Sequence, residues 1–153
     1  MLTEEEVLLK RVMAVKLNRI LSDYIKAHDT VFGGSPLRAL RRLVPVPGFF
    51  DAIPYADLES QLRVQEQRLA DYRSNADSID CSPALREFVE TYIEFADALT
   101  DTVRRLRTIC ARLSHRVLDP ASYSKAAYKK DLSEYKASAM AYQEVGGRLN
   151  RLV

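Results

Sequence analysis

A row of carboxylates is the feature of this sequence that most resembles a ligand set for a metal ion. Its members recur at steps of three and four residues: Glu87, Glu90, Glu94, Asp97 and Asp101. On a helix this spacing places them on one face, where carboxylate oxygens can attract a divalent cation. That face lies almost opposite the apolar stripe of the same helix, and no histidine joins it. The pattern therefore favours a solvated acidic face over a metal site.

Other groups that catalyse reactions are sparse. The chain contains two histidines, His28 and His115, and two cysteines. It lacks the Glu-x-x-His motif of carboxylate di-iron bundles, a Cys-x-x-Cys pair, a Gly-rich phosphate loop and a nucleophile elbow. His28 lies at the edge of an apolar stripe, which is typical of a hydrogen-bonded residue near a helix end. We expect no catalytic residue, no metal ion and no cofactor.

Positive charges gather in three segments that the expected topology brings to one end of the molecule. They are Arg38, Arg41 and Arg42, then Arg112 and Arg116, then Lys125, Lys129 and Lys130. The helix dipole favours cations at a helix C-terminus but not at an N-terminus, where the three lysines lie. Acidic residues collect at the opposite end, so the net charge of +2 hides a dipolar molecule. We call the eight cations the basic end.

The element on which this charge map depends is a helix expected from Ser82 to Leu118. Apolar residues recur there at steps of three and four, from Leu85 to Val117, which indicates a helix with one buried stripe. Ser82 is a good N-cap, and Pro83 suits the first turn. Such a helix is roughly 55 Å long. It needs partners of similar length to cover its stripe.

Three further long helices are expected. The first begins at Thr3, where Thr3 and Glu6 match a capping box, and ends near Phe32 before two glycines. The second covers Tyr55 to about Ala76, with Gln65 on its otherwise apolar stripe. The last is capped by Asp119 with Pro120 at its first position, and its inner face carries Tyr128, Tyr135 and Tyr142.

The segment from Gly33 to Pro54 breaks this pattern. Ser35 and Pro36 can begin a short helix, and the apolar pair Phe49 and Phe50 follows a stretch rich in proline and glycine. We expect a packed crossover, because a long connection without structure of its own is uncommon in a compact domain. The sequence leaves open whether Phe49 and Phe50 are buried or displayed.

These elements predict one all-α domain over residues 1–153. We expect an antiparallel up-down-up-down four-helix bundle with a long first crossover that contains a short extra helix. No apolar run approaches the ~20 residues of a transmembrane segment, and the acidic start does not resemble a secretory signal. The two cysteines would lie about 40 Å apart along one helix, too far for a disulfide. Free thiols favour a cytoplasmic location.

Two functional hypotheses follow. The first is a non-enzymatic protein–protein interaction module whose protein partner is unknown. The partner can be a second copy, which would give a homodimer, because an outer face that is acidic in one half and basic in the other can pair with an antiparallel copy of itself. The apolar crossover with Phe49 and Phe50 would add contact area. The second is binding of a polyanion, such as nucleic acid, a phosphorylated partner or an acidic lipid surface, at the basic end. We recognise no family motif in the sequence.

Overall fold

The structure, a computed structural model, describes residues 1–33 and 53–153 of the 153-residue chain. These residues form four long α-helices and one short 3-10 helix, and none of them lies in a β-strand. The helices are α1 (Glu4–Phe32), α3 (Tyr55–Asp77), α4 (Pro83–Leu118) and α5 (Lys125–Leu152), and the 3-10 helix η1 spans Pro120–Ser122. The all-helical prediction is confirmed. The short helix expected after Ser35 lies outside the described residues.

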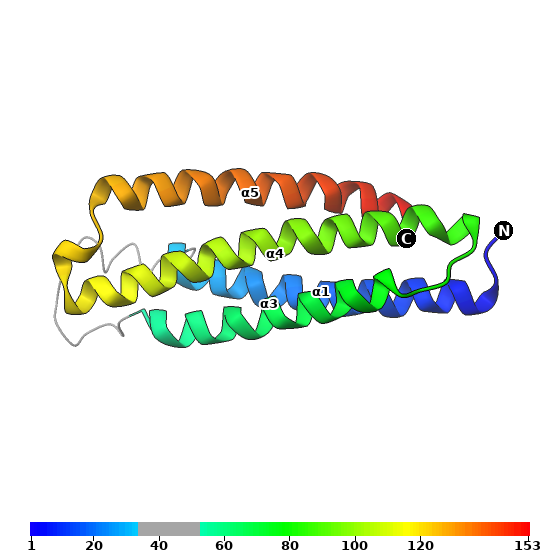
Figure 1. The fold of residues 1–153 in the computed structure, drawn as a ribbon, viewed down its shortest axis with the longest axis horizontal. Coiled ribbons are helices and arrows are strands. Elements are labelled where there is room, and N and C mark those ends of the chain that lie inside the picture. Colours follow the sequence, from blue (N-terminus) through cyan, green and yellow to red (C-terminus); the bar gives the residue numbers. More distant parts are fainter. Residues whose placement is uncertain (34–52) are drawn as a thin grey trace.

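The four helices lie alongside one another, and each runs in the opposite direction to the one before it in the chain (Figure 1). α4 makes the most extensive contacts, with α3 on one side and α5 on the other. α1 packs less extensively, against α3 and α4. The arrangement makes α4 the helix on which the others are assembled.

The ends of α4 are set by the residues that the sequence indicated. The Ser82 hydroxyl accepts a hydrogen bond from the Leu85 backbone N–H at 3.3 Å, and Pro83 occupies the first turn. The buried face runs without interruption from Leu85 to Leu113. Val117 was expected on this face, but it is 73% exposed, so that prediction is wrong. The last turn of α4 extends beyond the core, and Leu118 is exposed beside it.

α1 begins and ends as predicted. The Thr3 hydroxyl accepts from the Glu6 N–H at 3.2 Å, and the Glu6 carboxylate accepts from the Thr3 N–H at 2.9 Å. Gly33 follows the last turn with φ of 71°, a left-handed conformation that glycine adopts without strain. The reciprocal cap and the glycine therefore fix both ends of this helix.

The predicted start of the last helix is wrong. Asp119 caps only the 3-10 helix η1, and α5 begins at Lys125 with Ser124 as its cap, whose hydroxyl accepts from the Ala127 N–H at 3.1 Å. Between them Tyr123 is extended and its side chain is buried. The extended backbone that buries the Tyr123 side chain interrupts the helical path, so α5 begins only after it.

Gly146 and Gly147 do not end α5, which continues to Leu152. A Cβ at Gly146 would lie 2.9 Å from Cε2 of Phe95, whereas one at Gly147 would meet nothing within 4 Å. Phe95 is buried and packs edge-on against Tyr142. Gly146 therefore lets α5 approach α4 closely, and Gly147 has no such role.

We predict opposite effects for alanine at the two glycines. Gly147→Ala raises the free energy of unfolding by about 0.5–1 kcal/mol, because alanine is the better helix former. Gly146→Ala gains the same propensity but overpacks Phe95, at a cost of about 1–3 kcal/mol, so its net effect is destabilising. Urea denaturation of both variants measures the difference. Equal stabilisation by the two substitutions would contradict the close packing at Phe95.

Candidate functional site

The polar face of α4 is joined to α3 by ion pairs. Glu66 of α3 accepts a hydrogen bond from Nε of Arg104 and another from Nε of Arg107, each at 2.8 Å. Partial burial alone would raise the pKa of Glu66, but the two guanidinium groups outweigh it and leave the pKa below its ordinary value. Nearer the start of α4, Arg73 of α3 donates to Asp97 at 3.0 Å.

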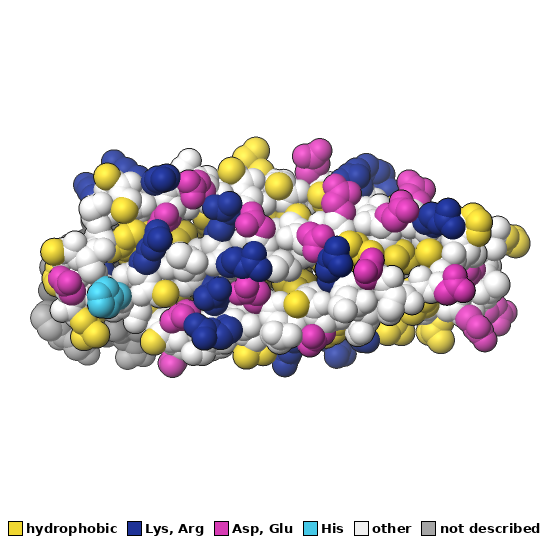
Figure 2. Space-filling view, in the orientation of Figure 1, with side chains coloured by type: hydrophobic (Ala, Val, Ile, Leu, Met, Phe, Trp, Pro, Cys, Tyr) yellow, Lys and Arg dark blue, Asp and Glu magenta, His cyan; other side chains and the backbone are white. Residues whose placement is uncertain are grey.

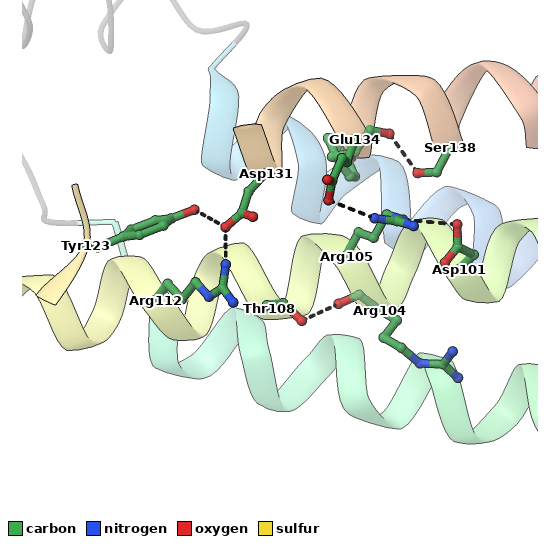
Figure 3. A network of polar contacts seen from close by, with 10 residues as sticks. Asp101, Arg104, Arg105, Thr108, Arg112, Tyr123, Asp131, Glu134 and Ser138 are labelled. Atoms are coloured by element: carbon green, nitrogen blue, oxygen red, sulfur yellow. Dashed lines mark hydrogen bonds and ion pairs between the residues drawn. The ribbon is translucent and has the colours of Figure 1, made fainter. Parts of the chain in front are cut away.

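The same face is joined to α5 on its other side, as Figure 3 shows. Arg105 donates to Asp101 at 3.1 Å within α4 and to Glu134 of α5 at 3.3 Å. Asp131 of α5 accepts from Arg112 and from the Tyr123 hydroxyl, the latter at 2.6 Å. We call the ion pairs that link α4 to α3 and α5 the α4 ladder.

Asp131, like Glu66, is one of the most buried acids of the α4 ladder. Partial burial would raise its pKa, but the hydrogen bonds from Tyr123 and Arg112 lower it below the ordinary value of an aspartate. Arg112 also lies over the Tyr123 ring, 5.8 Å from its centre. These contacts hold η1, the end of α4 and the start of α5 together.

The α4 ladder changes the interpretation of the carboxylate row. Glu94 pairs with Arg148 of α5, and Asp97 and Asp101 have arginine partners as well. Across residues 1–33 and 53–153, no group of three or more acidic, histidine or cysteine side chains is arranged to hold a metal ion. Figure 2 shows Lys and Arg side chains interspersed with Asp and Glu along this face. Glu94 and Asp97 therefore connect α4 to α5 and to α3. Asp101 holds Arg105, which in turn pairs with Glu134 of α5.

Two open grooves follow the ladder, one on each side of α4. The groove toward α3 has a volume of about 390 Å³ and is lined by Arg63, Glu66, Arg104 and Arg107 among others. The groove toward α5 measures about 280 Å³ and includes Asp101, Arg112 and Glu134 in its lining. Most of these charges already have partners inside the chain. A ligand in either groove would have to compete with those ion pairs.

The structure places only part of the basic end. Arg38, Arg41 and Arg42 lie outside the described residues, as do Phe49 and Phe50. Arg112 is engaged with Asp131. Arg116 near the end of α4, and Lys125, Lys129 and Lys130 in the first turns of α5, are exposed at the end of the molecule where those two helices meet.

A buried polar cluster lies between α1 and α5, and no pattern in the sequence predicted it. The Tyr135 hydroxyl is hydrogen-bonded to the Tyr24 hydroxyl and lies 2.7 Å from Nδ1 of His28. Burial lowers the pKa of His28 more than the neighbouring Asp29 carboxylate raises it, and burial raises the pKa of both tyrosines. His28 is therefore the hydrogen-bonded helix-end residue that its position indicated. The tyrosine spacing predicted an inner face, but not this pairing across helices.

The two cysteines are free, as expected from their separation. Cys110 is fully buried, and burial raises the pKa of its thiol to about 12. A thiol in that environment stays protonated and is a poor nucleophile. It fills space in the core.

The outer face of α1 differs from the other helix surfaces. The exposed large apolar side chains of α4 are confined to its last turn, and α3 and α5 each expose one, Val64 and Met140. α1 exposes five: Val7, Leu8, Val12, Val15 and Ile25. The middle three are 62%, 43% and 49% exposed. They lie within about 60° of one another on the side of α1 turned away from the core.

Comparisons with known proteins assign no function to these surfaces. No family model matches the sequence, and neither the curated proteins nor the solved structures contain a match. In the part of the chain that the structure describes, no helix has both the length and the hydrophobicity of a membrane span.

The buried tyrosine cluster gives a prediction for stability. Tyr135→Phe removes the hydroxyl that both Tyr24 and His28 use, and we expect it to lower the free energy of unfolding by about 1–3 kcal/mol because buried polar groups lose their partner. Adding Tyr24→Phe removes the Tyr24 hydroxyl, which is one of the two buried groups that Tyr135→Phe leaves without this partner. The double variant should therefore lose less than the sum of the two single variants. Chemical denaturation measures all three; strictly additive losses would contradict the cluster.

Proposed function

We propose that this protein is a non-enzymatic helical interaction module that binds a protein partner through the outer face of α1. In this proposal α4 organises an up-down-up-down bundle, and residues 1–153 act as a single domain. The observation that carries the proposal is the concentration of exposed apolar side chains on α1. The free thiols are compatible with a cytoplasmic location, which we include in the proposal.

The energetics favour α1 over the charged face. Covering the exposed parts of Leu8, Val12 and Val15 would contribute on the order of 3 kcal/mol, since full burial of one such side chain is worth about 1.5–3 kcal/mol. An exposed ion pair contributes about 0–1 kcal/mol, and those of the α4 ladder are already formed within the chain. Apolar contact on α1 can therefore supply affinity, while charges around it orient the partner.

Site-specific photo-crosslinking tests the proposal. A photoreactive residue at position 12 should yield a discrete adduct in an extract of the cells that produce the protein. The same residue at position 64 should not, although Val64 is a similarly exposed valine on α3. Excess unlabelled protein should compete for the adduct. The proposal fails if position 12 gives no adduct, or only the products that position 64 gives.

A second candidate function is polyanion binding at the basic end. Lys125, Lys129 and Lys130 are exposed in the first turns of α5, where the helix dipole disfavours cations. Unfavourable placement of charge is a reason to look for an anionic ligand, and such binding would weaken steeply with salt. The exposed Arg116 would belong to the same site.

Heparin chromatography distinguishes this second candidate. The double variant Lys129→Glu/Lys130→Glu should elute at a much lower salt concentration than the control double variant Lys136→Glu/Arg151→Glu. The control makes the same change in net charge elsewhere on α5. All four residues are exposed. Identical elution of the two double variants would remove the basic end as a specific site and leave only the effect of net charge.

A further inference from the structure

We infer that the partner of the α1 outer face is a second copy of this chain, docked antiparallel about a two-fold axis beside Val12. This inference rests on the proposed function, because it names the occupant of that same surface. A two-fold interface uses the same patch on both copies, so the patch must be self-complementary. The spacing of apolar and charged residues along α1 meets this condition.

One antiparallel register brings the three exposed apolar residues of the two copies together. Leu8 and Val15 are seven residues apart, or two helical turns, with Val12 between them. When Leu8 of one copy lies level with Val15 of the second copy, symmetry places Val15 of the first level with Leu8 of the second. The two Val12 side chains then meet beside the axis. Three apolar layers result, all from side chains that are exposed in the single chain.

The charges that flank these layers are complementary in the same register. Glu4 precedes Leu8 by about one turn, and Arg19 follows Val15 by about one turn. An antiparallel copy therefore brings Glu4 level with Arg19 of the second copy, twice by symmetry. Both side chains are exposed. A parallel copy in the same register would instead place Glu4 opposite Glu4, which is repulsive.

Arg11 makes the pairing imperfect. It lies about 60° from Leu8 around the helix, so the two copies of Arg11 flank the axis on the same side. Like charges this close repel, although long arginine side chains can extend into water. Three apolar layers are also a small contact for a stable dimer, which usually buries about 1,200 Å² or more in total. We therefore infer a reversible dimer that forms as protein concentration rises.

Sedimentation velocity of the purified 153-residue chain over a series of concentrations tests the inference. The wild type should shift from monomer to dimer. Val12→Glu, which brings two carboxylates together at the axis, should remain monomeric. Val64→Glu on α3 is the matched control and should dimerise like the wild type. Circular dichroism establishes that each variant is folded.

A charge exchange tests the register. Glu4→Arg and Arg19→Glu should each weaken the dimer, and the double variant should restore it. Arg11→Gln should strengthen it. A dimer that persists in Val12→Glu, or single charge variants that behave like the double variant, would overturn the inference. A wild-type protein that stays monomeric at every concentration would also overturn the dimer inference. In that case a specific photo-crosslink from position 12 to another protein would still support the proposed function.

Discussion

The unbroken apolar stripe of α4 is the constraint from which the rest of the molecule follows. Leu85 to Leu113 must be removed from water along one side of a 36-residue helix. A single neighbouring helix cannot bury the whole stripe, because it would cover one side of the stripe and leave the rest exposed to solvent. α3 and α5 cover two sides, and α1 contributes a third set of buried residues. The opposite face of α4 is left to charged residues.

Those charged residues then have a structural role. Their helix neighbours lie within reach on both sides, so arginines of α4 meet acids of α3 and α5, as Glu66 and Asp131 illustrate. Each such pair contributes little free energy on its own, but together they fix how far each helix slides along α4. A face occupied in this way is poorly suited to bind a partner. The proposed interaction surface is therefore the outer face of α1.

The contacts that attach α1 include buried polar groups beside its apolar side chains. Its interface contains the cluster of Tyr24, His28 and Tyr135. On α3 the side chain of Gln65 is buried beside α1, and its Oε1 has no hydrogen-bond partner among the described residues. An unsatisfied buried amide oxygen costs free energy, which makes this seam less stable than a wholly apolar one. Apolar residues lie on both the inner and the outer face of α1, which is the arrangement that the proposed docking of a partner on its outer face requires.

Much of the fold could be read from local signals in the sequence. The caps at Thr3 and Ser82 and the periodic stripe of α4 depend on residues within a few positions of one another, and the structure confirms them. Gln65 was correctly placed inward. The start of α5 was missed because the burial of Tyr123 is a tertiary effect that overrides a good cap at Asp119. Val117 was misplaced because periodicity does not reveal where the partner helices end.

The contents of the candidate site were harder to predict. The acidic and basic residues of α4 were visible as two rows, but their partners on α3 and α5 lie 19 to 54 residues away in the sequence, as for Arg112 with Asp131 and Arg148 with Glu94. The hydrogen bond between the Tyr24 and Tyr135 hydroxyls links residues that are 111 positions apart in the sequence. Such pairs depend on the rotation and sliding of whole helices, which helical periodicity does not fix. The apolar outer face of α1 was missed because Leu8, Val12 and Val15 stand in the sequence among charged residues such as Arg11 and Lys16, which are typical of a solvated face.

Backbone amide NMR spectra recorded during dilution of the uniformly labelled protein would show which surface meets a second copy. If the outer face of α1 is that surface, the signals of residues 4–19 change with concentration, while those of the α4 ladder keep their positions. Concentration-dependent changes along the charged face of α4 or at the start of α5, with the α1 signals unchanged, would contradict this account.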